Sequence, residues 1–333
     1  MKKCVCFGEI LLRLCPPDGT RIGQTEHLTM TFAGAEANVA ASLKNYGLDA
    51  SFVTKLPKDN AVAEAFLYQM RGFGVDTSDI AFGGERMGLF FLEQALSVRP
   101  AKVLYDRKNS AIANIRPGDI DWDKAFEGAS WFHWSGITPA LSEACAQETM
   151  AACRIAKSKG IKISCDLNYR KPLWTPEQAQ KTMTPLMPYV DVIIANESEP
   201  KDLFGMTAPA DLYENGQLTK EGYVYLAEKM TGEFGSAKCG FAIREKNAAR
   251  DYIWSGLLYD RATGKTHATK KYPLTIADRI GAGDAFSAGL VAALMQDRDD
   301  DYAVRFATAV SAYKHTFMGD FNRVTVAEAE AIM

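Results

Sequence analysis

The chain has 333 residues, of which 47% are hydrophobic and 24% charged, and its 38 basic and 41 acidic side chains leave a net charge of −3. A chain this apolar and this weakly charged is not intrinsically disordered. The balanced charge and a pI near 5.9 argue against a general nucleic-acid-binding surface. No apolar run approaches the roughly 20 residues of a membrane helix, and the N-terminus reaches Gly8 and Glu9 too soon for a secretory signal. The length predicts either two domains or one large α/β domain with an appendage.

The seven cysteines form no Cys-x-x-Cys pair and have no histidine cluster nearby. We therefore expect reduced, mostly buried thiols, as in a reducing compartment, and we predict a cytoplasmic protein. The four histidines are scattered without metal-ligand spacing, which favours packing or surface roles and argues against a structural metal site.

Short apolar runs alternate with longer amphipathic segments along the chain. The longer segments predict helices such as Ala35–Tyr46, closed by Gly47, and Glu143–Ser158, closed by Gly160. Such alternation indicates βαβ units and a mainly parallel sheet covered on both faces, whose ligands bind beyond the carboxyl ends of the strands. The strands are predicted over Lys3–Phe7, Ser51–Leu56, Ser130–Trp134, Ile161–Cys165, Val190–Ala195 and Lys238–Ile243.

Two regions, Leu11–Phe32 and Gly88–Arg107, interrupt this alternation because they are β-rich and lack a helical period. In the second region a period of two places Val103, Tyr105 and Arg107 on one face of a strand. We therefore expect one α/β domain over residues 1–333, with a small β-sheet lid formed by about residues 11–33 and 86–110. Apolar residues on an exposed lid sheet could pair it with a second copy of the chain.

The strongest motif is the segment Asp278–Gly289, in which a glycine-flanked turn leads directly into an apolar helix. The free amides and positive dipole end of such a helix suit a phosphate or a developing anion. Asp284 stands in the first helical turn, where a carboxylate is favoured. Taken alone, the motif equally fits a capped helix whose glycines serve only packing. It is not a P-loop.

Asp278–Gly289 resembles the C-terminal signature of the ribokinase/PfkB family of carbohydrate kinases, and Gly34–Ala40 resembles the first signature of that family. The two lie roughly 250 residues apart, in the expected order. The resemblance implies a ribokinase-like α/β fold with a β lid. It also implies that Asp284 is the catalytic base. The amides of Gly281, Ala282 and Gly283 would form the anion hole for the transferred phosphoryl group.

The segment Asn196–Glu199 follows a predicted strand and resembles the NxxE motif of the same family. Taken alone, the pair is more simply a helix start, with Asn196 as N-cap and Glu199 at the third helical position. The resemblance instead implies that Glu199 holds Mg²⁺, through water, for the phosphates of ATP.

Two arginines carry the prediction of the acceptor. Arg107 lies beside Tyr105 on the lid strand, and Arg170 follows the predicted strand Ile161–Cys165. Each arginine alone is more simply explained by a surface ion pair. Two guanidinium groups directed at one pocket suggest a substrate carboxylate, which a neutral sugar lacks.

Gly8–Leu14 and Trp131–Pro139 resemble the branch of the family that acts on 2-keto-3-deoxy sugar acids. This resemblance implies ATP-dependent phosphorylation of the 6-hydroxyl of 2-keto-3-deoxygluconate. The implied sugar-acid contacts are Gly34, Asn38, Tyr105, Arg107, Arg170, Asp284 and Asp320. The implied ATP contacts are Asn168, Asn196, Arg244, Glu245, Lys246, Asn247, Gly281 and Gly283.

Some residues depart from the family pattern. Ala33 replaces the usual first glycine before Gly34, and Phe90 and Phe91 stand where related chains often carry a tyrosine. The segment from Arg244 to Asp251 is bulkier and more charged than many nucleotide loops. Two alternatives therefore stay open: a kinase of a neutral ketose such as fructose, and a non-catalytic sugar-binding relative. The preferred configuration at C4 of the sugar acid also stays open.

Overall fold

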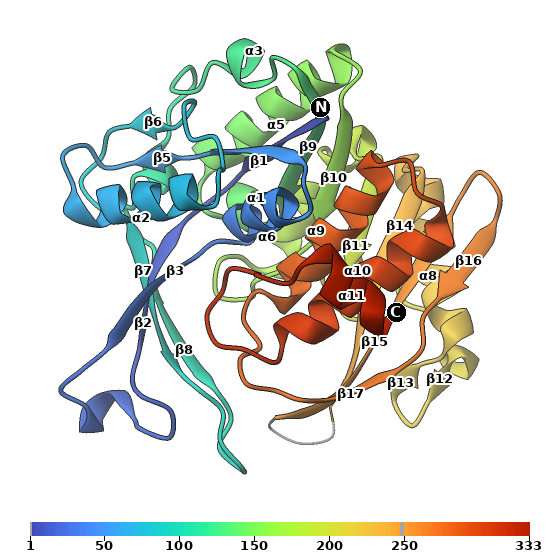
Figure 1. Ribbon diagram of the computed structural model, residues 1–333. Coiled ribbons are helices and arrows are strands. Elements are labelled where there is room, and N and C mark those ends of the chain that lie inside the picture. The colour runs from blue at the N-terminus through green and yellow to red at the C-terminus, as the bar shows by residue number, and fades with distance from the viewer. Residues whose placement is uncertain (1, 247–249) are drawn as a thin grey trace.

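The structure of the chain is a computed structural model that describes residues 2–246 and 250–333 (Figure 1). Its largest sheet runs in the order β16-β15-β14-β11-β10-β9-β1-β4, and β17 also pairs with β15. The six strands from β14 to β4 are parallel, whereas β15, β16 and β17 add an antiparallel edge. The strands are β1 (Lys3–Phe7), β4 (Asp49–Val53), β9 (Ala129–Ser135), β10 (Lys162–Asp166), β11 (Val192–Ala195), β14 (Lys238–Lys246), β15 (Asp251–Asp260), β16 (Lys265–Ala268) and β17 (Tyr272–Thr275).

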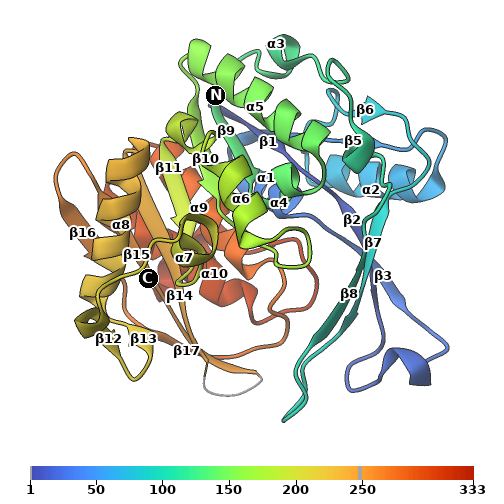
Figure 2. The same ribbon diagram turned by 180° about the vertical axis from the view of Figure 1, so that it is seen from behind.

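Helices cover both faces of this sheet, so the predicted mainly parallel, doubly covered α/β architecture is confirmed. One face carries α1 (Ala35–Asn45), α2 (Ala61–Gly72), α9 (Ala282–Met295), α10 (Asp300–Lys314) and α11 (Val326–Ile332). The opposite face carries α5 (Glu143–Ser158), α6 (Pro176–Met183), α7 (Glu199–Phe204) and α8 (Lys220–Phe234), as Figure 2 shows. A separate hydrophobic cluster lies on each side of the sheet, which is why its central strands are apolar along their length.

A second, four-stranded sheet projects from this body (Figures 1 and 2). Its strands are β2 (Leu11–Cys15), β3 (Thr29–Ala33), β7 (Gly88–Glu93) and β8 (Lys102–Asp106), in the order β3-β2-β7-β8. One face of this small sheet carries a row of apolar side chains that crosses all four strands. The pairing register aligns these residues as Met30, Leu14, Phe91 and Leu104, and Met30 and Leu104 are exposed.

Two predicted strands differ from the structure by more than a shift of one or two residues at an end. The predicted strand Ser51–Leu56 is interrupted at Thr54, because β5 (Lys55–Leu56) leaves the large sheet and pairs with β6 (Ala81–Phe82). The predicted strand Lys238–Ile243 extends to Lys246, because residues 244–246 pair with residues 252–254 of β15. The segment predicted as a nucleotide loop is therefore partly one arm of a β-hairpin, and Asn247 lies outside the described residues.

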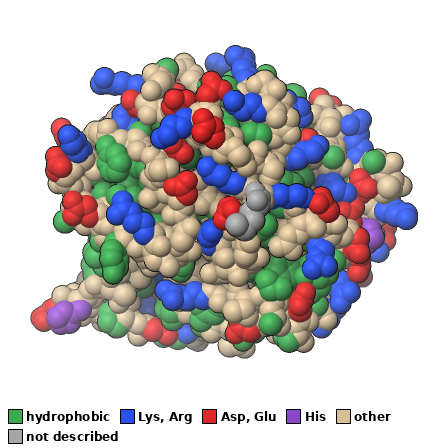
Figure 3. Space-filling view, turned by 45° about the horizontal axis from the view of Figure 1, so that its top comes forward, with side chains coloured by type: hydrophobic (Ala, Val, Ile, Leu, Met, Phe, Trp, Pro, Cys, Tyr) green, Lys and Arg blue, Asp and Glu red, His purple; other side chains and the backbone are tan. Residues whose placement is uncertain are grey.

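The remaining elements are short. They are α3 (Trp122–Ala125), α4 (Ile137–Ala140), β12 (Tyr213–Glu214), β13 (Gln217–Leu218) and the 3₁₀ turns Ile22–Gln24, Ile112–Asn114, Met187–Tyr189 and Ala210–Leu212. All seven cysteines lie in the described part of the chain, where they are buried and form no disulfide, as predicted. None of the helices of residues 2–246 and 250–333 has the length and apolar character that crossing a membrane requires. Acidic and basic side chains are interspersed over the face shown in Figure 3.

Candidate active site

A cavity of about 340 Å³ lies where the carboxyl ends of the parallel strands meet one face of the small sheet. It brings together most of the residues that the sequence singled out. Gly34 and Asn38 come from the start of α1, Tyr105 and Arg107 from the small sheet and its end, Asn168, Arg170, Asn196 and Glu199 from the segments after β10 and β11, and Gly281, Ala282, Gly283 and Asp284 from the start of α9.

The start of α9 has the backbone geometry of an anion site. Gly281 is the N-cap residue and has a left-handed backbone, with φ of 81°. A β-carbon there would lie 2.2 Å from the carbonyl oxygen of Asp320, so only glycine fits this position without displacing the neighbouring chain. The free amides of the following turn open onto the cavity, and their positive dipole end favours a negatively charged ligand.

Asp284 stands in the first turn of α9 and lines the cavity. Its Oδ2 accepts a hydrogen bond of 2.6 Å from Nδ2 of Asn38, which fixes the orientation of the carboxyl group. Burial raises the pKa of Asp284, and the Asn38 hydrogen bond opposes that shift. The structure therefore presents an oriented carboxylate beside the anion site, with Asn38 bonded to that carboxylate.

Two further carboxylates, Glu199 and Asp166, line the same cavity. The backbone amides of Tyr169 and Asn196 donate to the two oxygens of Glu199, at 3.0 and 2.8 Å. Asp166, at the end of β10, accepts a hydrogen bond of 3.2 Å from the hydroxyl of Ser287. Burial is the main cause that raises the pKa of Glu199 to about 8 and of Asp166 to about 7, and the charge of Asp166 adds to the shift at Glu199. Ser198, rather than the predicted Asn196, is the N-cap residue of α7.

The two predicted substrate arginines line the same cavity but have different environments. Arg107 stacks on Tyr105, with its guanidinium carbon 4.2 Å from the ring centre, and its Nη1 lies 3.2 Å from Oε2 of Glu9. Burial raises the pKa of Glu9 to about 7, and the charge of Arg107 opposes that shift. Arg170 is exposed at the cavity mouth.

Arg244 lines the cavity together with the aromatic side chains Tyr252 and Trp254. Its guanidinium carbon lies 5.7 Å from the ring centre of Tyr252. Arg244 and Glu245 also border a neighbouring cleft of about 900 Å³ on the side of α8. Lys246, another predicted nucleotide contact, is the last residue of β14.

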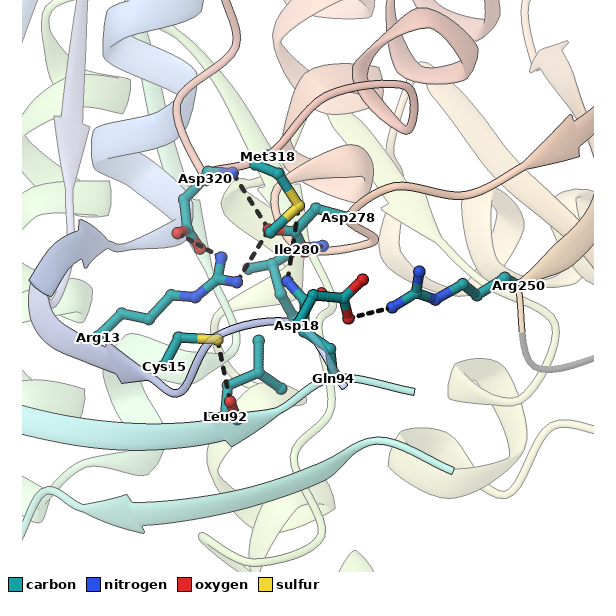
Figure 4. A network of polar contacts seen from close by, with 11 residues as sticks. Arg13, Cys15, Asp18, Leu92, Gln94, Arg250, Asp278, Ile280, Met318 and Asp320 are labelled. Carbon is teal, nitrogen blue, oxygen red and sulfur yellow. Dashed lines mark hydrogen bonds and ion pairs between the residues drawn. The ribbon is translucent and has the colours of Figure 1, made fainter. Parts of the chain in front are cut away.

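Asp320 does not line this cavity, unlike the other predicted sugar-acid contacts. Its buried carboxylate is bonded instead to Arg13, a residue of the small sheet that the sequence analysis does not single out (Figure 4). An arginine among apolar residues of a short strand, as in Leu-Leu-Arg-Leu-Cys, is the available signal for such a buried contact.

Four acidic residues that line the cavity also receive no role from the sequence: Glu9, Glu36, Asp166 and Glu197. Glu36 accepts hydrogen bonds from the amide and the hydroxyl of Ser135, at 2.9 and 2.6 Å, and from the hydroxyl of Thr138, at 3.0 Å. Glu9 and Glu36 are almost completely buried, which is unusual for glutamate. For Glu9, Glu36 and Asp166, the only local signal in the sequence is a position near a glycine or at the end of a strand.

The fold and this cavity define a carbohydrate kinase of the ribokinase-like class. The family model described as pfkB family carbohydrate kinase matches residues 1–224 and 254–321. The chain belongs to this family.

Its similarity extends to relatives over nearly the full length. A crystal structure of 2-dehydro-3-deoxygluconokinase from Thermotoga maritima is 44% identical, with a TM-score of 0.94, over 99% of this chain and 97% of that one. The 2-dehydro-3-deoxygalactonokinase of Haloferax volcanii is 31% identical over 99% of this chain and 96% of its own length. The 2-dehydro-3-deoxygluconokinase of Bacillus subtilis is 26% identical over 97% of this chain and 93% of its own.

Proposed function

We propose that the protein phosphorylates the 6-hydroxyl of 2-keto-3-deoxygluconate with ATP, giving 2-keto-3-deoxy-6-phosphogluconate. The observation that carries this proposal is that one cavity holds both the Gly281–Asp284 turn and the two arginines Arg107 and Arg170. The turn suits phosphoryl transfer, and the arginines suit a carboxylate on the acceptor. The similarity to a 2-dehydro-3-deoxygluconokinase supports the proposal. The names 2-dehydro-3-deoxygluconate and 2-keto-3-deoxygluconate denote the same acid.

Asp284 acts as the base in this proposal. The acceptor oxygen attacks the γ-phosphorus of ATP, the bond from that phosphorus to the β,γ-bridging oxygen breaks, ADP leaves, and the hydroxyl proton passes to Asp284. The amides of Gly281, Ala282 and Gly283 stabilise the charge that develops on the phosphoryl oxygens. Asn38 holds the carboxylate in the orientation for proton transfer through its 2.6 Å hydrogen bond.

The sugar acid binds between the small sheet and the end of β10. Arg107 and Arg170 pair with its carboxylate, and Tyr105 fixes the plane of the Arg107 guanidinium. Gly34 and Asn38 lie at the cavity wall formed by α1, where they contact sugar hydroxyls. The ion pair of Arg107 with Glu9 prepositions the guanidinium before the acid arrives.

The nucleotide extends from the Gly281 turn across Asn168 and Asn196 toward Arg244. Tyr252 and Trp254, which are almost completely buried, form an apolar part of the cavity wall. Arg244 supplies positive charge beside them, and Glu245 lies just beyond in the neighbouring cleft.

The carboxylates of Glu199 and Asp166 fit a bound Mg²⁺ ion. Glu199 and Asp166 are hard oxygen donors whose buried charges destabilise each other, and no group of three potential metal ligands forms a closed protein cage among the described residues. Mg²⁺ keeps several waters when it binds to proteins, and Glu199 and Asn196 would hold those waters here. When bound, Mg²⁺ would neutralise charge on the ATP phosphates.

The small sheet, formed by residues 11–33 and 86–110, acts as a lid on a single α/β domain of residues 1–333. The apolar row of Met30, Leu14, Phe91 and Leu104 on its outer face provides a surface for pairing with a second copy of the chain. Use of ATP and the buried, unpaired thiols support a cytoplasmic location.

An acceptor panel tests this proposal. Purified protein with MgATP is assayed for ADP release with gluconate-derived and galactonate-derived 2-keto-3-deoxy acids, fructose and ribose. We expect kcat/KM to be highest for the gluconate-derived acid. Preference for the galactonate-derived acid would change the assigned configuration at C4. Preference for fructose would overturn the proposal that the acceptor is a sugar acid.

The variant Asp284→Asn separates an enzyme from a sugar-binding relative. The amide cannot accept the hydroxyl proton, so we expect turnover to be lost, while calorimetry still detects ATP binding because the anion-site amides are unchanged. Retained turnover would contradict the role of Asp284. Acid binding without any ADP release by the unmodified protein would favour a non-catalytic relative.

A further inference from the structure

A buried ion cluster joins the lid to the body of the protein, and the proposed reaction does not use it. Arg13 lies on β2 of the lid, and its side chain is only 3% exposed. Its Nη1 lies 2.8 Å from Oδ2 of Asp320, and its Nη2 lies 2.9 Å from Oδ2 of Asp278 (Figure 4). Both carboxylates belong to loops of the body, so a single lid side chain bridges two body loops.

These two loops shape the anion site. Oδ1 of Asp278 accepts a hydrogen bond of 3.1 Å from the amide of Ile280, the residue before Gly281. Oδ2 of Asp278 accepts one of 3.2 Å from the amide of Gly319, the residue before Asp320. The carbonyl of Asp320 in turn packs directly against Gly281. A shift of either carboxylate therefore moves the backbone that carries the anion-site amides.

The charges of the cluster balance only when the lid is in place. Asp278 and Asp320 are both buried, and the body supplies one nearby buried cation, Lys314. Nζ of Lys314 forms no hydrogen bond with any residue in ranges 2–246 and 250–333 and lies 4.8 Å from the ring centre of Phe317. Arg13 supplies the second positive charge, a hydrogen bond to Asp320 and an ion pair with Asp278. Without it, two buried carboxylates would face one ammonium group.

We propose that Arg13 is a positioning residue that makes the shape of the anion site depend on a docked lid. The inference rests on the proposed kinase function. Tyr105 and Arg107, which hold the acid, lie on or next to strand β8 of the same sheet as Arg13. Binding of the acid stabilises the docked lid, the docked lid fixes Arg13, and Arg13 fixes Asp278, Asp320 and the Gly281 turn. Phosphoryl transfer is thereby coupled to the presence of the acceptor.

The test compares Arg13→Ala with Asp18→Asn. Asp18 forms another lid-to-body ion pair, 2.5 Å from Arg250, but it is exposed and does not touch the loops at Gly281. We expect kcat of Arg13→Ala to fall about a hundredfold, since small displacements of catalytic groups cost this much. KM for ATP should change little, whereas KM for the acid should rise, because the docked lid loses two ion pairs. Added guanidinium should restore part of the lost kcat. Asp18→Asn should change kcat by less than about twofold.

A second variant covers the case in which Arg13→Ala does not fold. Arg13→Lys keeps the charge but cannot bond both carboxylates with one planar fork, so we expect it to fold and to lose about tenfold in kcat at unchanged KM for ATP. Wild-type kcat in folded Arg13→Ala or in Arg13→Lys would overturn the proposal. An equal loss in Asp18→Asn would also overturn it, because lid docking in general would then be responsible. An unmodified protein without turnover would instead contradict the kinase function.

Discussion

Arg107 and Arg170 illustrate how two identical side chains acquire different roles from their surroundings. Arg107 is nearly buried, stacked on Tyr105 and already paired with Glu9, whereas Arg170 is exposed at the mouth of the same cavity. An incoming carboxylate must compete with Glu9 for Arg107 but meets Arg170 in contact with solvent. We therefore expect Arg107 to set selectivity and Arg170 to contribute most to capture.

Alanine substitution of each arginine tests this division. Both Arg170→Ala and Arg107→Ala should raise KM for the sugar acid about tenfold or more while KM for ATP changes little, because each loses a charge-assisted contact to the acid. Arg107→Ala should also reduce discrimination against fructose. Steady-state kinetics with both acceptors measures these effects. Arg154→Ala, which removes an exposed arginine of α5 that does not line the cavity, is the matched control. Unchanged kcat and KM for the acid in both variants would refute the proposed binding of its carboxylate by Arg107 and Arg170.

At the scale of elements, α9 combines a functional start with a tightly packed body. Its first turn forms the proposed anion site, and most of its remaining residues are buried against α1, α10 and the sheet. Gly289 marks the closest approach, since a β-carbon there would lie 2.8 Å from the α-carbon of Ala307 in α10. The packing of α9 thus holds the Gly281 turn at a fixed distance from the strand ends.

Two glycine-to-alanine changes in helices should have opposite effects on stability. Gly289→Ala should lower the free energy of unfolding by about 1–3 kcal/mol, because the new methyl group meets backbone atoms that cannot move aside. Gly232 lies at an exposed position of α8, and a β-carbon there would meet no neighbouring atom within 4 Å. Gly232→Ala should therefore raise the free energy of unfolding by about 0.5–1 kcal/mol through helix propensity. Urea denaturation of both variants checks the signs. A stabilised Gly289→Ala would show that α9 and α10 can separate without cost.

Local periodicity predicts the elements that are buried on both faces, and it fails where partners are distant. The apolar runs of β1, β9, β10 and β11 are recognisable from the sequence alone. Each of these strands is buried on both faces, so most of its side chains must be apolar. The boundary at Thr54 and the extension of β14 depend on β6 and β15, which no local pattern specifies. Arg13 was missed for the same reason, since Asp320 lies 307 residues further along the chain.

At the scale of the whole molecule, several buried carboxylates carry raised pKa values. Burial raises the pKa of Glu36 from 4.5 to about 7, although three hydrogen bonds from Ser135 and Thr138 oppose the shift. The native state therefore holds this proton more tightly than the unfolded chain does. Its contribution to stability is fully present below pH 4.5 and is lost as the pH rises through about 7.

Glu36→Gln should remove this pH dependence. Relative to the unmodified protein, the variant should gain on the order of 3 kcal/mol in unfolding free energy between pH 4 and pH 8, because the amide does not ionise. Urea denaturation across that range measures the difference. Glu221→Gln, at an exposed position of α8, is the matched control and should show a flat difference. A flat difference for Glu36→Gln would mean that the glutamate is charged at no cost.

The position of β1 has a consequence for the order in which the chain folds during synthesis. Strand β1 is paired on one side with β4 and on the other with β9, which ends at Ser135. Cys4, Val5 and Phe7 therefore keep an unpaired edge until β9 has left the ribosome. During that interval the segment is open to chaperones and to other nascent chains, so slow translation before β9 should favour aggregation.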